Sequence, residues 1–376
     1  MNQRELNEIR RRIKPERNSI SHIYGCYVNG AKEIISYIDE SVGLLMKEEQ
    51  EKYMSLLKKS LSGALGKNLV SLSFATKQVM DSDEHRLLSA LRKTELKDAV
   101  LREEFYRCII NSLQLEDSNY LILLAFDAYD VPRRNRDGSE DDSGEVFKYI
   151  LCSVCPVKSG KAQLGYDADE KRFHSAVMSQ VVAAPELGFM FPSFDDRSAN
   201  IYNALFYSRN TEELNSDFIN AVFHTAVPMS AGRQRDTFSL ALTESAENSL
   251  SYDVVQSVHE QLRERIDIHK ESRDPEPLSL STQEMGEILE NSGFSPAEAE
   301  SFCKKVERDF GEDAELRPAN LINSKKLEIN TPEVKISVDP KFGYLIQTQV
   351  VNGKKYIVIS ADAGVEVNGI AVDIKE

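Results

Sequence analysis

The chain of 376 residues lacks long apolar runs, internal repeats and low-complexity tracts, and it has only five cysteines. Because no run approaches about 18 apolar residues, no transmembrane helix is predicted. The N-terminal segment has no apolar core after its charged residues, so we expect no secretory signal. The cysteines are odd in number and widely scattered, which favours a reducing cytoplasm over a disulfide framework. These absences predict a cytoplasmic protein.

Basic residues are also in deficit. The chain has 46 Lys and Arg against 61 Asp and Glu, which gives a formal charge of −15. Such an excess of negative charge disfavours non-specific association with nucleic acid or anionic lipid, although it leaves room for a local basic face. The apolar and charged fractions, 41% and 28%, are those of a globular protein. The length predicts two or three domains.

Several catalytic and metal-binding motifs are missing or incomplete. Cys152-x-x-Cys155 lies in an apolar run, and residues three apart on a strand point to opposite faces, so we interpret both as buried structural cysteines. The segment 63–68 resembles a phosphate loop but has too few residues between its glycines and no Ser or Thr after the lysine. No HExxH, G-x-S-x-G or GxGxxG pattern is present. The sequence therefore predicts no cofactor and no metal.

The strongest structural signal is a group of near-continuous apolar runs at about 119–208, including NYLILLAF and GFMFPSF. Runs of this kind are typical of strands buried on both faces, so helices should cover the sheet on either side. The predicted fold class is α+β, with a mixed, largely antiparallel central sheet covered by helices. A helical hairpin and a small C-terminal antiparallel β unit should follow it.

Composition predicts where the domains divide. The segment 271–280 combines two prolines with high charge and no apolar period, so it is the expected linker. We expect a mixed α/β body over 1–270, a helical hairpin over 281–322 and a small antiparallel β domain over 325–376. In the last of these, the apolar pattern changes to period two.

Two kinds of local signal support these elements. Asn29-Gly30 and Asn352-Gly353 each lie between strand-like runs and predict tight hairpins, because both residue types accept positive φ. The segments 281–284 and 295–298 each read as a capping box that opens a helix.

Polar residues gather where two of the buried strands end, in FDAYDVPRR and FPSFDDRSANIY. Like charges brought close together raise one carboxyl pKa, which suits acid–base chemistry or metal binding. The competing interpretation is that these residues form structural Asp–Arg ties at turns. If the two strand ends are adjacent, their polar residues could form one catalytic site. The candidates are Asp127, Asp130, Asp195, Asp196 and Arg197.

The one basic cluster lies near the N-terminus, where Arg4 and Arg17 flank it and Glu5, Glu8 and Glu16 dilute it. A solvated helix face is the simpler interpretation, and contact with nucleic acid or an acidic partner is the functional one. The residues that would make such a contact are Arg10, Arg11, Arg12 and Lys14.

Several segments together are similar to one known family. They include LNEIRRRIKPERNSISHIYGCYVNG, LSGALGKNLV, NYLILLAFDAYDVP, PELGFMFPSFDDRSANIYNALFY and the VEVNGIAV tail. Over nearly the whole chain they resemble the bacterial domain-of-unknown-function 4317 proteins, typical of anaerobic Gram-positive bacteria. The resemblance implies a bacterial cytoplasmic protein, and it brings no activity, cofactor or catalytic residue.

Failed motifs and a modular layout favour a non-enzymatic protein that binds another macromolecule, and a protein partner is expected. One alternative is a nucleoid-associated or phage-defence-type nucleic-acid binder, which the net charge disfavours. It depends on a fold-level analogy and the basic cluster alone. The other alternative is an enzyme that uses the strand-end carboxylates, with or without a divalent metal.

Overall fold

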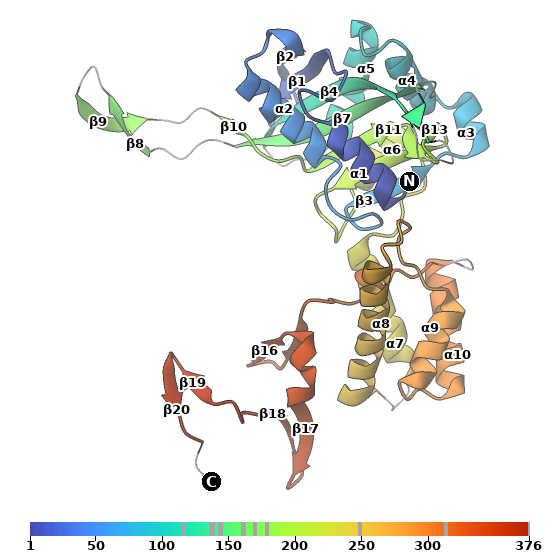
Figure 1. Ribbon diagram of the computed structural model, residues 1–376, viewed down its shortest axis with the longest axis vertical. Coiled ribbons are helices and arrows are strands. Elements are labelled where there is room, and N and C mark those ends of the chain that lie inside the picture. Colours follow the sequence, from blue (N-terminus) through green and yellow to red (C-terminus); the bar gives the residue numbers. More distant parts are fainter. Residues whose placement is uncertain are drawn as a thin grey trace. The chain divides into compact units, whose positions relative to one another are not determined.

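The structure is a computed structural model, and it divides into two compact units. The first comprises Met1–Arg233 with Pro275–Pro277, and the second comprises Gln234–Asp274 with Leu278–Glu376 (Figure 1). The structure describes residues 1–374 except 115–117, 135–139, 142–145, 159–162, 168–170, 177–179, 247–249 and 312–314.

The first unit is built on one large sheet, in which every strand pairing is antiparallel. The strand order is β2-β1-β4-β7-β11-β14-β3, and β10 pairs with β7. This arrangement confirms the predicted antiparallel central sheet of an α+β fold. The strands are β1 (His22–Val28), β2 (Ile34–Ser41), β3 (Leu69–Ser73), β4 (Asn119–Asp130), β7 (Val146–Lys158), β10 (Val181–Val182), β11 (Leu187–Phe191) and β14 (Asn203–Ser208).

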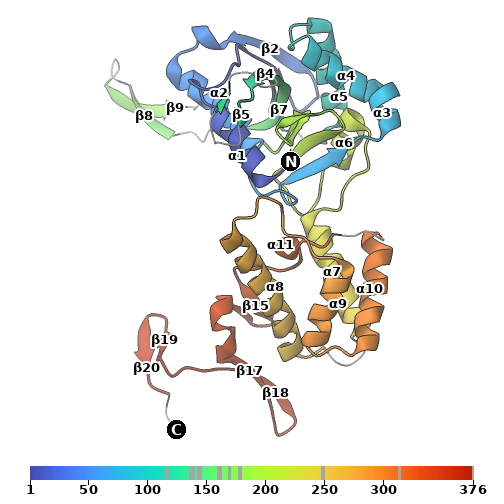
Figure 2. The ribbon, with the colours of Figure 1, turned by 45° about the vertical axis from the view of Figure 1, so that its right-hand side comes forward.

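Helices cover both faces of this sheet, as the doubly buried strands predict (Figure 2). Cys152 belongs to the core under α4, α5 and α6, whereas Cys155 belongs to the core under α1 and α2. The two sulfurs therefore point to opposite faces, as strand geometry requires. The helices are α1 (Gln3–Arg12), α2 (Lys47–Lys59), α3 (Thr76–Asp81), α4 (Asp83–Lys93), α5 (Ala99–Ser112) and α6 (Ser216–Phe223).

Short elements join the main ones in the first unit. The hairpin of β12 and β13 lies next to the sheet and carries Asp196 and Arg197 at its turn, with φ of 49° and 57°. The other short elements are η1 (Val42–Leu44), β5 (Arg133–Arg134), β6 (Glu140–Asp141), β8 (Gln163–Asp167), β9 (Arg172–Ala176), β12 (Ser193–Asp195) and β13 (Ser198–Asn200).

The predicted hairpin at Asn29-Gly30 is present, but its turn is wider than expected. Strand β1 ends at Val28 and β2 begins at Ile34, and the positive φ of 63° belongs to Lys32. The Asn29 side chain accepts the Glu33 N–H at 2.9 Å and donates to the Glu33 carboxylate at 2.9 Å. Asn29 therefore closes a five-residue loop through its side chain, in place of the predicted two-residue turn.

The second unit has a helical core. Both predicted capping boxes are confirmed, because Ser281 and Ser295 each exchange hydrogen bonds with the Glu three residues later. The helices are α7 (Ala231–Ser245), α8 (Tyr252–Ser272), α9 (Thr282–Asn291), α10 (Pro296–Phe310) and α11 (Pro318–Leu321).

Helices α7 and α8 contribute Phe238, Leu242, Val258 and Leu262 to the same core as α9 and α10. Helix α7 and most of α8 lie within the 1–270 segment that the sequence assigned to the body, and the last two residues of α8 lie in the predicted linker. Contacts therefore group them with the predicted helical hairpin, while the predicted domain boundaries themselves stay a prediction.

The C-terminal part consists of separate two-stranded hairpins. At the second of them Asn352 and Gly353 have φ of 50° and 77°, which is the tight turn that the dipeptide predicts. The elements are β15 (Leu327–Asn330), β16 (Lys335–Val338), η2 (Pro340–Leu345), β17 (Ile346–Val351), β18 (Lys354–Ile359), β19 (Val365–Val367) and β20 (Ile370–Val372).

Candidate functional site

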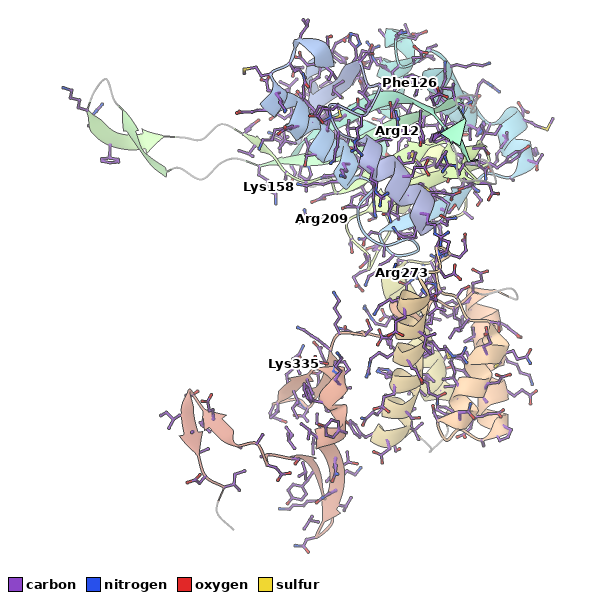
Figure 3. All side chains as sticks on the ribbon, in the orientation of Figure 1. Arg12, Phe126, Lys158, Arg209, Arg273 and Lys335 are labelled. Atoms are coloured by element: carbon purple, nitrogen blue, oxygen red, sulfur yellow. The ribbon has the colours of Figure 1, made fainter. Side chains whose placement is uncertain are left out.

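Helix α1 brings the basic cluster and the strand ends together. Its apolar side, with Leu6 and Ile9, is buried in the core on one face of the sheet. Its start is fixed by Asn2, whose side chain accepts the Glu5 N–H while the Glu5 carboxylate accepts the Asn2 N–H at 2.8 Å. The charged side of α1 consequently lies beside the ends of β4 and the β12–β13 hairpin (Figure 3).

Asp127 is fully buried beneath α1 and is held by three donors. The Ser19 N–H donates to Oδ1 at 2.7 Å, Tyr149 Oη donates to Oδ2 at 2.6 Å, and Arg12 Nη2 lies 3.2 Å from Oδ2. Burial and the Asp127 charge raise the pKa of Tyr149 well above its ordinary value, so the phenol stays a donor. Asp127 is therefore a satisfied structural anchor for α1.

Arg12 turns inward and serves two partners. Its guanidinium pairs with Asp127 and lies over the ring of Tyr129, 4.1 Å from the ring centroid. Only 17% of the Arg12 side chain is exposed. A cation that pairs with a buried carboxylate and packs on an aromatic ring stabilises the fold.

Arg197 forms the second connection to α1. Its Nη1 pairs with the Glu8 carboxylate at 2.8 Å, its Nη2 donates to the Pro132 carbonyl at 3.0 Å, and its backbone N–H donates to Glu5 at 3.2 Å. Tyr129 Oη also donates to Glu8, at 2.6 Å. Burial and this bond to a carboxylate raise the pKa of Tyr129 to about 12, so this phenol is protonated at neutral pH.

Asp195 is tied to the N-terminus. The ammonium group of Met1 lies 2.5 Å from Oδ1, and Ser193 and Asn200 donate to the carboxylate at 2.9 and 2.7 Å. Burial acts to raise the pKa of Asp195, but these donors outweigh it and the pKa is lowered. Asp195 is thus an ionised, fully engaged carboxylate.

The strand-end carboxylates do not converge on one cleft. Asp130 and Asp196 are exposed to solvent, whereas Asp127 is buried and Asp195 is bonded to the chain's amino terminus. Of the five catalytic candidates, only Arg197 lines the groove described below. The contacts of Asp127 and Arg197 connect α1 to the sheet and to the β12–β13 hairpin, while a catalytic role for the five candidates stays a prediction.

The basic cluster of α1 also divides into two sets. Arg10 donates through Nε and Nη2 to the carbonyls of Leu61 and Gly63, at 2.5 and 2.8 Å, which fixes α1 to the segment after α2. Burial lowers the pKa of Arg10. Arg11 and Lys14 are exposed. A helix period of 3.6 residues turns neighbours in an Arg-Arg-Arg run in different directions, so the three side chains meet different partners.

An open groove of about 710 Å³ lies along the charged side of α1, and we call it the α1 groove. Arg4, Arg11 and Arg17 line it with exposed guanidinium groups that have no ion pair with any residue the structure describes. Its lining consists of Asn2, Arg4, Glu5, Asn7, Glu8, Arg11, Arg12, Arg17, Tyr129, Pro132 and Arg197.

This lining carries five guanidinium groups against two carboxylates, and both carboxylates are already bonded within the fold. The α1 groove is therefore a local basic surface on a chain of negative formal charge. Arginine forks match carboxylate and phosphate oxygens, so the groove is suited to an anionic ligand.

Three residues that hold this arrangement, Glu5, Glu8 and Tyr149, were not among the candidates chosen from the sequence. Glu5 could have been found, because Asn2-Gln-Arg-Glu5 is a capping-box pattern. Glu8 and Tyr149 have no such signal, because they are defined by contacts with residues far away in the chain.

Other features of the described residues add no chemistry to this site. No helix within the described ranges has both the length and the apolarity to cross a membrane. No three His, Cys, Asp or Glu side chains among the described residues are grouped to hold a metal ion. Burial raises the pKa of Cys155 to about 12, and that of Cys152 well above its ordinary value, so neither is a reactive thiolate at neutral pH.

The sequence profile of a family described as "Domain of unknown function (DUF4317)" matches residues 1–370. Among curated proteins, no match to the chain is found.

Proposed function

We propose that the chain, which belongs to the domain-of-unknown-function 4317 family, is a non-enzymatic binding protein that receives an acidic segment of a protein partner in the α1 groove. The observation that supports the proposal is the set of guanidinium groups of Arg4, Arg11 and Arg17, which line one groove and form no ion pair with a described residue. We place this protein in the bacterial cytoplasm, in keeping with its five free cysteines.

Charge supports an acidic ligand. Internal pairing uses Arg12 and Arg197 to neutralise Asp127 and Glu8, and what is left on the surface of the groove is positive. Elsewhere the chain carries a large excess of Asp and Glu, so an acidic segment would be repelled from most of the surface and attracted here.

A protein segment fits this site better than a nucleic acid. A duplex presents a continuous line of phosphates, which a net charge of −15 opposes over most of the contact area. Three free arginines provide few phosphate contacts, and the Tyr129 ring face is already covered by Arg12, so it is not free to stack on a base. A short acidic peptide needs only the groove itself.

Acid–base catalysis is poorly served by the same residues. Arginine holds its proton at every physiological pH, and Tyr129 has a pKa of about 12, so neither exchanges a proton readily near neutrality. Glu5 and Glu8 are occupied as acceptors within the fold. The groove is thus better suited to holding a charged ligand than to transforming one.

The test measures binding of a fluorescent oligoglutamate peptide, a DNA duplex and a single strand by anisotropy at low salt. We expect the peptide to bind more tightly than either nucleic acid and to be released by added salt. Changing Arg4, Arg11 and Arg17 together to Gln should weaken the peptide at least about tenfold, which is about 1.4 kcal/mol.

The control is Arg107→Gln on α5, which removes one positive charge from a helix on the opposite face of the sheet and is compared with Arg11→Gln alone as well as with the triple variant. It should leave peptide affinity unchanged. Tighter binding of DNA than of peptide, lost in the triple variant, would replace this proposal with the nucleic-acid alternative. Peptide affinity that is equal in the triple variant and the control would exclude the α1 groove.

A further inference from the structure

Hairpin β17–β18 exposes apolar side chains on both of its faces. Paired residues share a face, so Val350, Ile357 and Ile359 lie on one side, and Val351, Tyr356 and Val358 on the other. Their exposed fractions run from 37% for Ile357 to 70% for Val350. Ile346 at 3% is the one buried residue of these two strands.

Such a hairpin is incomplete by itself. Two antiparallel strands alone are at best marginally stable in water, and three or more strands with an apolar face are needed for independent stability. Within the described residues β17 pairs with β18 alone, so the other edge of β17 carries unpaired backbone groups beyond Ile346, whose N–H donates to the Gly343 carbonyl. An open edge of this kind is a template for another strand.

The two edges of the hairpin differ. Strand β18 begins with Lys354 and Lys355, and lysine on an edge strand opposes pairing with another strand. Strand β17, IQTQVV, has no charge and no proline along its six residues. The edge of β17 is therefore the one open to addition.

We propose that this edge pairs with the same edge of a second copy of the chain, so that β17 lies antiparallel to β17 about a two-fold axis at Thr348. A two-fold axis perpendicular to the sheet keeps each face on its own side, so residues of the same parity must oppose each other. Ile346 then faces Val350, Gln347 faces Gln349, and Thr348 faces Thr348 of the second copy.

These opposed pairs are complementary. An aliphatic pair, an amide pair and a Thr–Thr pair are each favourable across antiparallel strands. The direction of the backbone N–H groups of β17 also agrees with this pairing. In a two-residue hairpin the closing pair, Val351 and Lys354, exchanges both bonds, and bonding alternates along the ladder. Thr348 is three residues from Val351, so its N–H points away from β18 and towards the open edge.

Charge favours a second copy as the occupant. Residues 325–376 contain seven basic and seven acidic residues, so the negative formal charge of the chain lies entirely in residues 1–324. Two C-terminal segments therefore meet without net repulsion between them. Pairing gives a sheet of order β18-β17-β17-β18, whose four strands exceed the minimum for stability. Val350, Ile357 and Ile359 of both copies then share one face.

The experiment measures the mass of the full chain by light scattering and sedimentation over a range of concentrations. We expect a dimer that dissociates on dilution. Thr348→Lys places two like charges directly opposite each other on the axis and should weaken the dimer at least about tenfold. Gln349→Lys adds the same charge one residue away, where it faces neutral Gln347 of the second copy, and should weaken it by less than about threefold.

A pair of variants with opposite charges at position 348 shows whether a loss of dimer comes from the interface or from misfolding. Thr348→Lys and Thr348→Glu should each dimerise at least about tenfold more weakly than the wild type, and the two variants combined should form a tighter mixed dimer, because opposite charges then face each other. A wild-type chain that stays monomeric at every concentration would overturn the proposal. A dimer whose dissociation constant is unchanged by Thr348→Lys, or two variants that do not rescue each other, would exclude this axis.

Discussion

Strands β4 and β18 each contain a tyrosine followed by a run of aliphatic residues, and the two runs have opposite surroundings. From Tyr120 to Ala125 every residue of β4 is buried, whereas every residue of β18 is exposed, including Ile357 and Ile359. The difference is in position. Strand β4 lies between β1 and β7 in a sheet with helices on both faces, whereas β18 pairs with β17 alone within the described part of the chain. An apolar run thus predicts a strand, and the number of its neighbours decides whether that strand is buried.

The two Asn-Gly sites show the same contrast for turns. In the C-terminal hairpin Asn352 and Gly353 adopt positive φ, as the dipeptide alone predicts. In the body, the Gly30 N–H donates to the side chain of Asn119 on β4 at 3.1 Å, and the turn opens to five residues. In an isolated segment the local preference of the dipeptide therefore sets the turn conformation. In a packed segment a tertiary contact overrides that preference.

Thiol labelling should give the largest difference between the two regions. Burial raises the pKa of Cys26 and Cys155 to about 12, against about 8.5 for a free thiol. At about pH 8 these buried thiols should react only on unfolding, whereas Val367→Cys on the 52% exposed side chain of β19 should react orders of magnitude faster. Mass spectrometry of the native and urea-unfolded chain measures the rates.

Equal labelling of Cys155 and of Val367→Cys in the native chain would contradict the contrast in burial. Raising the pH by one unit should leave the native labelling of Cys155 slow, because the group stays protonated below its raised pKa.

Truncating an aromatic residue should cost much more in the body than in the hairpin. Phe206 is fully buried, and its ring lies 5.8 Å from that of Phe218, so Phe206→Ala leaves a cavity and should lower the free energy of unfolding by about 3–5 kcal/mol. Tyr356 is 47% exposed, and Tyr356→Ala should change the unfolding of the first unit by less than about 0.5 kcal/mol. Urea titration followed by circular dichroism compares them.

Neighbouring arginines of α1 should behave in opposite ways. Arg12→Ala leaves Asp127 buried without its cation and should cost about 3 kcal/mol, whereas Arg11→Ala on the exposed side should cost less than about 0.5 kcal/mol. Adding Asp127→Asn to Arg12→Ala should restore part of the loss, since it removes the unpaired charge. If Arg11→Ala is as damaging as Arg12→Ala, the inward and outward assignments are wrong.

The sequence predicted those parts of the structure that depend on near neighbours. The doubly buried strands, the divergent cysteines Cys152 and Cys155, and the two capping boxes depend on spacings of a few residues. The α1 groove depends on contacts at long range. Arg12 and Asp127 are 115 residues apart, and Arg197 and Glu8 are 189 apart. No spacing rule connects such residues, so the sequence left the basic cluster and the strand ends as separate candidates.

Two glycines provide the smallest and most local test of the contrast. A Cβ atom added at Gly43 or at Gly353 would meet nothing within 4 Å, so space does not distinguish them. Their backbones do. Gly353 has φ of 77°, in the left-handed region where an L side chain is strained, whereas Gly43 lies in the helical turn η1 of the body.

Gly353→Ala should therefore destabilise the β17–β18 hairpin by about 1 kcal/mol, seen as faster amide exchange in β17 and β18 with unchanged exchange in β4. Gly43→Ala should leave the body unchanged or stabilise it by up to about 1 kcal/mol, because alanine restricts the unfolded chain without straining the folded one. Hydrogen exchange followed by mass spectrometry resolves both effects on one sample. Equal losses of stability in the two variants would mean that the positive φ of Gly353 does not close the hairpin. The conclusion that local preference sets the conformation of an isolated turn would then be wrong for this hairpin.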